Sequence, residues 1–580
     1  MAPILAVLVL SLLPWAALAA TVHVHWNVGY VYMDRDGKGV RRCIGVNGTL
    51  PVPPVHITKG DTLVLQVNNM LDVPTSMHAH GLFQNGTTFL DGPNMVSQCG
   101  IPPAQSFTYV YKEVAQSGLY WLHSHTNHQN AAGLRTPLVV HDLGSPPYQY
   151  DGDRLLWFED WYPREFDARA NQTIHSFPPP ITYPSALVNG YDGGKRMPAL
   201  LFAPAKTYRI RLVNMSITES FRFSIPGHPL HVIETDGYYT LPYAVDGVDM
   251  GPGQRYSVLV KAPPGKPAPN APVYKVELYA NFLPKRAQLN PLVHYGPVYQ
   301  NATQASSTLP ARYSHYSFDT RGKKDNKGLV WSNDILIQGL ANQRALPVDR
   351  QIVLNIGGAL FTDATTHDVI NNITYANSSV PTLYSVLTLP DSLVRNTTLY
   401  GGQTHSVVLD HMEAIELFVK NPNLLAHPMH LHGHRFQVVE YGPIAPSERP
   451  PSLPPTADDP GLQSEYQSIL DTIAPVVTNL GRPTERDTVA VPPMQYVKIR
   501  FRADNPGVWL FHCHMDIHFA MGMAMTFIEA PELLRKSTKI PKQMLDMCSA
   551  LGVKSSGNAV GNMDADLAGL PAAPSMVPTP

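Results

Sequence analysis

The segment 509–518 carries three potential metal ligands in succession, His512, Cys513 and His514. In a β-strand, successive side chains point to opposite faces, so the thiol of Cys513 would face away from both imidazoles. One short strand could therefore supply ligands to two different metal centres.

The neighbouring sequence offers partners for the thiol. His518 and Met523 follow Cys513 closely, and His427 opens another histidine-rich run further upstream. A thiolate, two imidazoles and a weakly bound thioether form the ligand set of a blue-copper centre. The sequence thus predicts a type 1 copper bound by His427, Cys513, His518 and Met523.

Paired histidines could serve a second centre. They lie in four His-x-His segments and are His78, His80, His123, His125, His430, His432, His512 and His514. Eight imidazoles suit a cluster of three copper ions.

Histidine pairs also arise by chance. With 24 histidines in 580 residues, roughly one His-x-His is expected at random, and a motif match is only a hypothesis. The pair His23 and His25 lies in an alternating strand pattern without a second cluster nearby, so we expect it, like His434, to be structural. The other four segments form two pairs of similar segments, and one carries a cysteine at blue-copper spacing, which favours metal binding.

These segments resemble the copper motifs of the multicopper oxidases, a family that includes laccases, ascorbate oxidases and fungal ferroxidases. The resemblance spans nearly the whole mature chain and implies four copper ions: one type 1, one type 2 and two type 3. It implies that His78 and His430 bind the type 2 copper. The type 3 ligands would be His80, His123, His125, His432, His512 and His514.

The same resemblance implies roles beyond the ligands. Asp91 and Asp516 would orient ligands and carry protons beside the cluster. The alternatives are ordinary turn chemistry for Asp91-Gly92 and a solvated surface acid for Asp516. His518 would be the edge at which electrons enter.

The chain has four cysteines, and Cys513 is expected to bind copper. An odd number of cysteines then remains to form disulfides in the oxidising compartment that we expect. Resemblance to laccases implies a disulfide between Cys99 and Cys548. Cys43 would then be a buried thiol, with pairing between molecules as the alternative.

Strands must position these ligands. The 55 prolines and many short alternating runs bounded by turn residues favour β-sandwiches over helices. Residues 62–67, 208–213 and 497–502 are representative, and each should bury one face. Residues 118–139 also read like residues 507–527, with Ser124 opposite Cys513, so the first domain should lack a type 1 copper.

We therefore predict an all-β chain of three cupredoxin-like Greek-key β-sandwich domains. The predicted order is a signal peptide (1–19), a first domain with cluster ligands (20–143), a metal-free spacer (144–324), a third domain with the type 1 copper and cluster ligands (325–554), and a disordered tail (555–580). The spacer could instead be a separate binding domain.

The amino terminus and composition indicate the compartment. Residues 1–19 are apolar and end in a small-residue cleavage pattern, although Lys and Arg are missing, which predicts secretion. No later segment offers the roughly 20 apolar residues of a membrane span, so no membrane anchor is expected. The net charge of −2 argues against nucleic acid as a partner. Asn-x-Ser/Thr sites, typical of a secreted glycoprotein, lie at Asn47, Asn85, Asn171, Asn214, Asn301, Asn372, Asn377 and Asn396.

Copper accepts electrons singly, whereas reduction of O2 to water requires four, so several coppers acting together fit an oxidase. An axial Met lowers the potential of a type 1 site relative to Leu or Phe, which favours an easily oxidised substrate. Resemblance to the ferroxidases would imply carboxylates near the type 1 histidines that bind Fe(II). This chain has Asn423 at one of these places and no acid in residues 197–206, where another would align.

We therefore expect a secreted, monomeric, laccase-like, copper-dependent oxidoreductase. It would oxidise a small phenolic or naphtholic substrate with O2, in pigment or polyketide biosynthesis for example. A ferroxidase and an ascorbate-oxidase-like enzyme are the alternatives, and a copper carrier is the least favoured.

Overall fold

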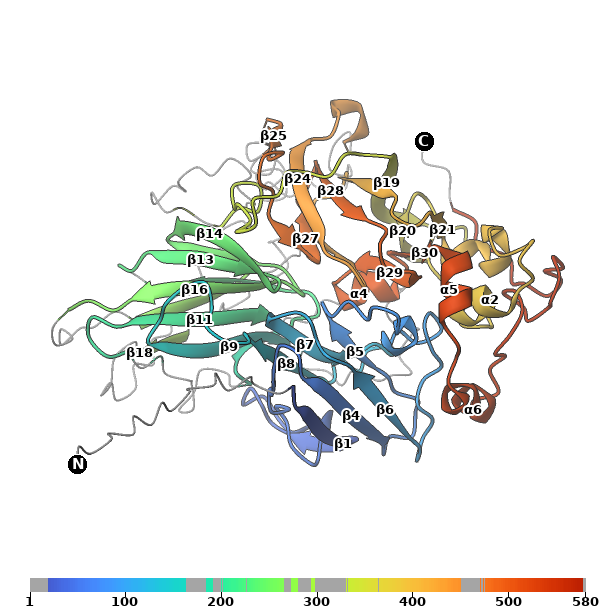
Figure 1. The fold of residues 1–580 in the computed structure, drawn as a ribbon, viewed down its shortest axis with the longest axis horizontal. Coiled ribbons are helices and arrows are strands. Elements are labelled where there is room, and N and C mark those ends of the chain that lie inside the picture. The colour runs from blue at the N-terminus through green and yellow to red at the C-terminus, as the bar shows by residue number, and fades with distance from the viewer. Residues whose placement is uncertain are drawn as a thin grey trace, which may run out of the picture.

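β-Strands dominate the structure, a computed structural model that describes residues 19–162, 184–190, 200, 202–225, 227–264, 273–279, 294–297, 330, 332–363, 365–449, 470, 473 and 475–576. The described strands form six sheets that make up three β-sandwiches in chain order, running from blue through green to orange and red in Figure 1. The predicted all-β fold is confirmed. No described helix is long and apolar enough to cross a membrane.

Some predictions fall outside the described residues. They concern residues 1–18 of the predicted signal peptide, the glycosylation sites Asn171 and Asn301, part of the segment 197–206, and the predicted boundary after residue 324. The boundary before residue 144 lies between two strands of neighbouring sandwiches, because β8 ends at His141 and β9 begins at Gly152.

The first sandwich has two four-stranded sheets, in the orders β2-β1-β4-β6 and β3-β8-β7-β5. Its elements are β1 (Thr21–Met33), β2 (Arg41–Val46), β3 (Val55–Thr58), β4 (Thr62–Asn69), β5 (Met77–His80), η1 (Thr88–Leu90), β6 (Ser106–Tyr111), β7 (Gly118–Ser124) and β8 (Arg135–His141).

The middle sandwich pairs a six-stranded sheet, β10-β9-β11-β16-β13-β14, with a four-stranded one, β15-β12-β17-β18. Its strands are β9 (Gly152–Trp161), β10 (Ser185–Val188), β11 (Thr207–Asn214), β12 (Ser220–Ser224), β13 (Leu230–Thr235), β14 (Tyr238–Val245), β15 (Gly247–Met250), β16 (Arg255–Lys261), β17 (Val273–Tyr279) and β18 (His294–Pro297).

The last sandwich has a seven-stranded sheet, β20-β19-β22-β28-β24-β25 with β26 also on β24, and a five-stranded sheet, β21-β30-β29-β23-β27. Its strands are β19 (Arg350–Leu360), β20 (Thr366–Ile370), β21 (Ser406–Leu409), β22 (Ala414–Asn421), β23 (His427–Leu431), β24 (Phe436–Pro443), β25 (Val477–Thr478), β26 (Glu485–Arg486), β27 (Thr488–Val491), β28 (Gln495–Arg502), β29 (Gly507–Cys513) and β30 (Ala524–Glu529). Its helices are α2 (Thr382–Thr388), η3 (Thr397–Tyr400), η4 (Gly402–Thr404), η5 (Pro446–Glu448), α4 (Asp516–Ala520), α5 (Pro531–Ser537) and α6 (Lys542–Ala550).

The predicted internal repeat appears as a repeated strand register. In the first sandwich β5 pairs with β7 so that His78 lies opposite His123. In the last sandwich β23 pairs with β29 so that His430 lies opposite His512. The same ladder therefore presents histidines from both ends of the chain.

A buried asparagine closes a loop in each of the three sandwiches. Asn69, Asn214 and Asn421 end β4, β11 and β22, and each is at most 1 % exposed. In each of these asparagines, the side-chain amide N–H groups donate to backbone carbonyls. The amide oxygen accepts from the backbone N–H of the residue two positions later. The middle sandwich is thus built on the same plan as the other two. Asn214 cannot carry a glycan, because its amide is buried and used in hydrogen bonds, although its sequence fits the glycosylation pattern.

Two of the representative strands show how far alternation predicts burial. β4 alternates as predicted, with Leu63, Leu65 and Val67 fully buried. β11 does not, because Arg209 and Arg211 at its polar positions are also buried. Arg209 pairs with Glu234, and Arg211 contacts Asp153 at 2.9 Å. Ion pairs satisfy these charges, so the predicted solvent face of β11 is an interior face.

A disulfide ties the carboxyl-terminal region to the first sandwich. Cys99 and Cys548 form the predicted disulfide, and Cys43 is a buried thiol that donates to the carbonyl of Arg41. The tail is not disordered from Ser555 onward as predicted. Asn558 and Ala559 are fully buried. The N–H of Ala559 donates to the carbonyl of Leu399, and its carbonyl accepts from the N–H of Ser379. The Asn558 amide donates to the carbonyls of Asp564 and Asp566.

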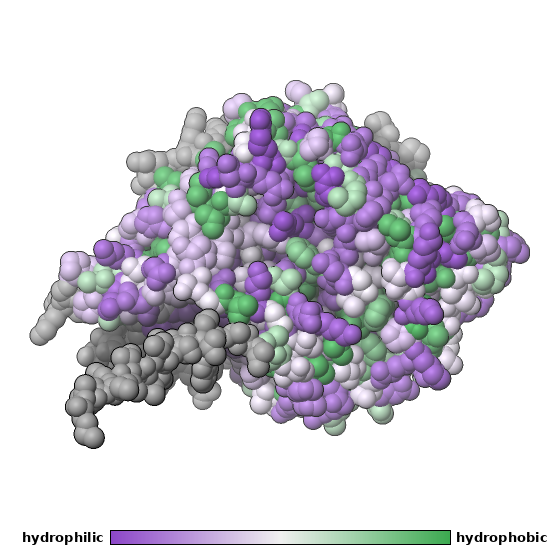
Figure 2. Space-filling model, in the orientation of Figure 1, coloured by the Kyte–Doolittle hydropathy of each residue, from purple (hydrophilic) through white to green (hydrophobic). Residues whose placement is uncertain are grey.

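The outer surface is mixed in character. Polar and apolar side chains are interspersed over the face shown in Figure 2. The apolar cores lie inside the sandwiches, and one of them joins strands of the first sandwich to α2, α6 and β29.

Candidate metal centres

A thiol and two imidazoles meet at one end of the last sandwich. Cys513 ends β29, His427 begins β23, and His518 lies on α4, the short helix that follows β29 and returns the chain over the thiol. The Cys513 Sγ lies 3.7 Å from Nδ1 of His427 and 3.6 Å from Nδ1 of His518, and these two nitrogens are 3.0 Å apart. Three soft or borderline donor atoms thus converge on one point.

The surroundings of this site are apolar. Met523 is fully buried in the same core cluster as Cys513 and Met429. Burial raises the pKa of the Cys513 thiol well above its usual value and lowers the pKa of His518 to about 4. A buried thiolate needs a positive partner, which a copper ion supplies.

The outer nitrogen of His427 reaches a neutral side chain. Nε2 of His427 lies 3.1 Å from the amide of Asn423, in the partly exposed loop that precedes β23. The atom of Asn423 in this contact is Nδ2, and because Nδ1 of His427 faces the thiol, an Nε2–H on His427 would need the amide turned so that its oxygen accepts.

A second cluster lies between the first and last sandwiches. The eight predicted histidines are all buried, and the side chains of seven of them meet in overlapping groups of three. His78, His80 and His123 form one group, and His125, His432 and His512 form another. His514 contacts His80, with 3.1 Å between Nε2 of the former and Nδ1 of the latter.

Hydrogen bonds set the direction of most rings. Nδ1 of His78 and His430 lies near the carbonyl oxygens of Asp91 and Asp487, at 2.7 and 2.8 Å. Nδ1 of His123 and His512 lies near carbonyl oxygens of β7 and β29. An N–H donated on one side leaves the other nitrogen unprotonated and ready to bind a metal.

The inward nitrogens fit copper. Nε2 of His78, His123 and His430 is buried and has no hydrogen-bond partner within the described part of the protein, which is costly unless another group binds there. Burial lowers the pKa of His80, His123, His125, His430, His432 and His514 well below the usual value, and that of His512 to about 3. Neutral imidazoles are the form that binds copper.

Of the two predicted carboxylates, Asp91 reaches the cluster. Its Oδ2 lies 2.9 Å from Nδ1 of His432, and its backbone carbonyl accepts from His78, so one residue holds rings from both sandwiches. Asp516 instead accepts two bonds of 3.1 Å from the Asn130 amide. Burial raises the pKa of Asp516 to about 7.

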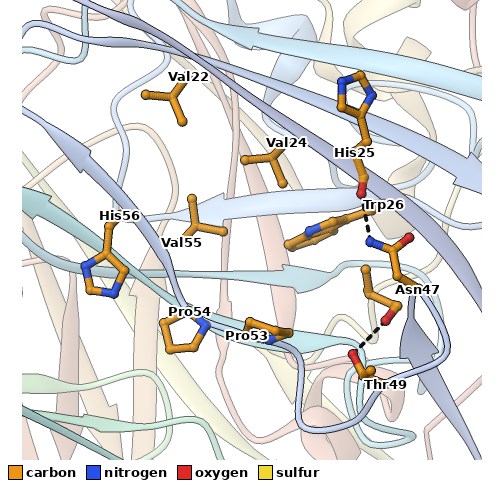
Figure 3. A pocket seen from close by; sticks show the side chains of 11 residues that line it. Val22, Val24, His25, Trp26, Asn47, Thr49, Pro53, Pro54, Val55 and His56 are labelled. Carbon is orange, nitrogen blue, oxygen red and sulfur yellow. Dashed lines mark hydrogen bonds between the residues drawn. The ribbon is translucent and has the colours of Figure 1, made fainter.

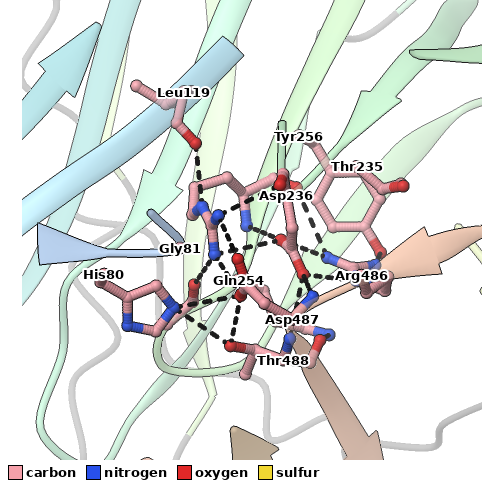
Figure 4. Close-up of polar contacts among 12 residues, drawn as sticks. His80, Gly81, Leu119, Thr235, Asp236, Gln254, Tyr256, Arg486, Asp487 and Thr488 are labelled. Atoms are coloured by element: carbon pink, nitrogen blue, oxygen red, sulfur yellow. Dashed lines mark hydrogen bonds and ion pairs between the residues drawn. The ribbon is translucent and has the colours of Figure 1, made fainter. Parts of the chain in front are cut away.

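A third carboxylate, Asp487, escaped the sequence analysis. Its Oδ1 lies 3.1 Å from Nε2 of His80, as Figure 4 shows. No motif marks Asp487, because its partners His80 and Arg255 lie more than two hundred residues away in the chain. An acid directly before β27, the neighbour of the histidine strand β23, is the one available signal.

Two other histidines, His434 and His25, lie outside these centres. His434, as predicted, contacts Glu529 at 2.8 Å and packs against Phe501 and Trp509. His25 lines a hollow of about 370 Å³ on the first sandwich, together with Trp26, Val55 and His56 (Figure 3). None of the proposed copper ligands lines this hollow.

Family models described as multicopper oxidase match residues 27–145, 152–271 and 375–533. An iron transport multicopper oxidase of Saccharomyces cerevisiae is 33 % identical over 575 residues, which cover 97 % of this chain and 88 % of that protein. A laccase of Thanatephorus cucumeris is 31 % identical, over 91 % of this chain and 94 % of its own.

Solved structures agree. The crystal structure of Fet3p, described as a multicopper oxidase that functions in iron import, has a TM-score of 0.78 and 29 % identity, covering 94 % of this chain and 98 % of that chain. The laccase from Botrytis aclada has a TM-score of 0.69 at 24 % identity, covering 92 % of each chain, and shows the fold alone. The predicted cupredoxin-like architecture is confirmed.

Proposed function

The chain belongs to the multicopper oxidases, and from this premise we propose that it oxidises Fe(II), one electron at a time, with O2 as the final acceptor. Similarity along almost the whole chain to iron transport multicopper oxidases carries this choice of reductant. The predicted phenolic substrate becomes the second candidate.

The family uses four copper ions, and the donor atoms described above fit them. We propose the predicted assignment: His427, Cys513, His518 and Met523 for the type 1 copper, His78 and His430 for the type 2 copper, and the other six paired histidines for the type 3 pair. Bound copper would supply single-electron transfer and the reduction of O2 to water.

The protein's part in the reaction follows from its covalent order. Cys513 lies between His512 and His514, so the thiol site and the cluster are joined through adjacent residues of one strand. His518 is 6 % exposed and His427 only 1 %, so we propose that electrons enter the thiol site at the edge of His518. Asp91 orients His432 and His78, and we propose that it and Asp516 serve proton delivery.

One observation favours the second candidate, a phenol. The amide of Asn423 contacts His427 where a carboxylate would attract Fe(II), and hard cations prefer anionic oxygen. Leu424 and Leu425 follow in the same loop and are partly exposed, which suits an aromatic reductant.

Secretion stays a proposal, supported by the apolar leader pattern and by the disulfide, and a monomeric state also stays a proposal. Among the described sequons, Asn85, Asn372, Asn377 and Asn396 are exposed and open to modification, unlike Asn214. Asn47 is also exposed, and its amide donates to the carbonyl of His25.

Oxygen uptake by the copper-loaded protein with Fe(II), a naphthol and ascorbate, side by side, tests the proposal. Saturable uptake that is fastest with Fe(II) supports it. Saturation with the naphthol and weak, unsaturated uptake with Fe(II) would move the function to phenol oxidation, and preference for ascorbate would replace both.

Asn423→Asp sharpens the same test. A carboxylate beside His427 should raise uptake with Fe(II) about tenfold, the effect of about 1.4 kcal/mol, and leave the blue absorption unchanged. Asn423→Leu is the matched control and should not raise it. No gain in the aspartate variant would show that Fe(II) is not bound at this loop.

A further inference from the structure

We propose that Arg255, a residue of the middle sandwich, is a positioning residue for the copper cluster and acts on His80 through Asp487. The inference rests on the proposed role of His80 as a type 3 ligand. It gives the middle sandwich, which we predicted to be a metal-free spacer, a direct part in building the cluster.

His80 is turned the opposite way from its neighbours. In His78, His123, His430 and His512, Nδ1 makes the outward contact to a carbonyl oxygen. In His80, Nδ1 faces Nε2 of His514 inside the cluster, and Nε2 points outward. His80 can therefore bind metal through Nδ1 only if its Nε2–H has a fixed acceptor.

That acceptor is Asp487. Its Oδ1 lies 3.1 Å from Nε2 of His80, and the Thr488 hydroxyl, 3.2 Å from the same nitrogen, donates to this carboxylate at 2.9 Å. The Asp487 carboxylate is buried, with only 2 % of the residue exposed. A carboxylate in this place needs a cation to hold it both ionised and correctly turned.

Arg255 supplies that cation as a fork. Its Nη1 and Nη2 donate to Oδ1 and Oδ2 of Asp487, both at 2.6 Å, and its side chain is fully buried. Two parallel bonds fix the plane of the carboxylate as well as its position. Because Oδ1 also contacts His80, the guanidinium sets the direction from which His80 is held.

Arg255 is itself held by all three sandwiches, through Leu119, Asp236 and Asp487, which Figure 4 labels. Its Nε donates to the carbonyl of Leu119 at 2.9 Å, and its backbone N–H donates to Asp236. Asp236 also accepts from Arg486, the residue before Asp487, at 2.9 Å. The guanidinium therefore has little freedom to turn.

Gly81, next to His80, confirms how tightly this pair is packed. A Cβ built there would lie 2.6 Å from Nη2 of Arg255 and 2.7 Å from Oδ2 of Asp487, and the residue has φ of +90°. Only glycine lets the histidine strand pass this close to the ion pair.

Arg255→Lys tests the proposal, because lysine keeps the charge and loses the fork. The matched control is Arg222→Lys, which makes the same change in another buried Arg–carboxylate pair of the middle sandwich, where Nη2 of Arg222 donates to Asp249 at 2.7 Å. Copper per chain after dialysis, the blue absorption and the electron paramagnetic resonance spectrum are measured for each.

We expect Arg255→Lys to keep the blue band but to retain cluster copper about 10 to 100-fold more weakly. Its spectrum should gain a signal from uncoupled type 3 copper, because the coupled pair is silent. Arg222→Lys should match the wild type. If the two variants behave alike, or if Arg255→Lys loses the blue band as readily as the cluster copper, the proposal is overturned.

Two further variants separate the possible failures. If Arg255→Lys does not fold, Asp487→Asn takes its place, because it preserves the shape of the side chain. It should give the spectral change expected of Arg255→Lys, and an unchanged spectrum would overturn the proposal. His80→Ala should lose cluster copper. If it retained all of it, the copper assignment of His80 itself would be wrong, whatever Arg255 does.

Discussion

The first and last sandwiches place different chemistry on the same backbone positions. Counting from the repeated histidine ladder, His427, Cys513 and His518 of the last sandwich correspond to Thr75, Ser124 and Gln129 of the first. The Thr75 and Ser124 hydroxyls donate to Oε1 of Gln129 at 2.6 and 2.8 Å. Leu134 stands where the last sandwich has Met523.

The difference shows what makes a metal site on this scaffold. In the first sandwich the three polar side chains satisfy one another and are buried without an ion. In the last sandwich a thiol and two imidazoles converge with no such closure, so an ion must complete the site.

A hairpin beside these sites extends the comparison. Asn47 follows β2 and Asn371 follows β20, both with φ near +50°, and each accepts from the neighbouring strand in the same way. Three residues before them lie Ile44 and Asp368. Asp368 is buried, and its Oδ2 has no hydrogen-bond partner among the described residues. The last sandwich thus carries a carboxyl where the first has an apolar side chain.

Cys513→Ser makes the last sandwich resemble the first and should have the largest effect. The blue band and oxidation of any reductant should fall to the detection limit, while cluster copper is retained, because the two sites use opposite faces of β29. Visible absorption and copper content check this. A retained blue band would contradict the type 1 assignment.

Asp91→Ala removes the residue that links His78 of the first sandwich to His432 of the last. Loss of such an outer contact typically costs 10 to 100-fold in metal affinity or activity, and we expect a fall of that size in O2 uptake. Asn130→Ala, which affects Asp516 instead, is the comparison variant. An unchanged rate of O2 uptake in Asp91→Ala would exclude a functional role of Asp91 at the cluster.

Asp368→Asn should stabilise the last sandwich in a pH-dependent way. Burial raises the pKa of Asp368 to about 8, so the folded state prefers the protonated form and stability is lost as pH rises from about 4 to 8. The variant escapes that loss and should gain about 1 to 4 kcal/mol at pH 7, and little at pH 4. Unfolding in denaturant at both pH values measures it. An equal gain at both would exclude ionisation as the cause, and Asp363→Asn, at an exposed position of the same hairpin, serves as control.

Gln129→Ala breaks the polar counterpart in the first sandwich and should have the smallest effect. It leaves the Thr75 and Ser124 hydroxyls buried without their acceptor, which costs about 1 to 3 kcal/mol. The blue band should not change. Denaturant unfolding and visible absorption together check this, and a weakened band would mean that the two sandwiches are not independent here.

The gathering of the histidines and of Cys513 could be predicted because their chemistry is local. A cysteine flanked by histidines, together with pairs such as His78 and His80, strongly favours metal binding, and strand alternation then fixes which atoms share a face. The fold class followed from alternation in strands such as β4.

Contacts between sandwiches could not be predicted. Arg209 and Arg211 occupy polar positions of an alternating strand, and only the approach of another element reveals that they are interior. Arg255 and Asp487 meet across 232 residues of chain, and nothing near either residue names the other. Asn214 shows the same limit, since its glycosylation pattern is genuine in sequence and excluded by burial.

The division of the proposed copper ligands between the two ends of the chain has a consequence for biosynthesis. His78 to His125 emerge early from the ribosome, whereas His512, Cys513 and His514 are among the last strand residues to be made. Neither centre can form before the last strands of the third sandwich are made, and the disulfide partner Cys548 comes later still. Any chaperone or compartment that supplies copper must therefore meet a chain that already contains all three sandwiches.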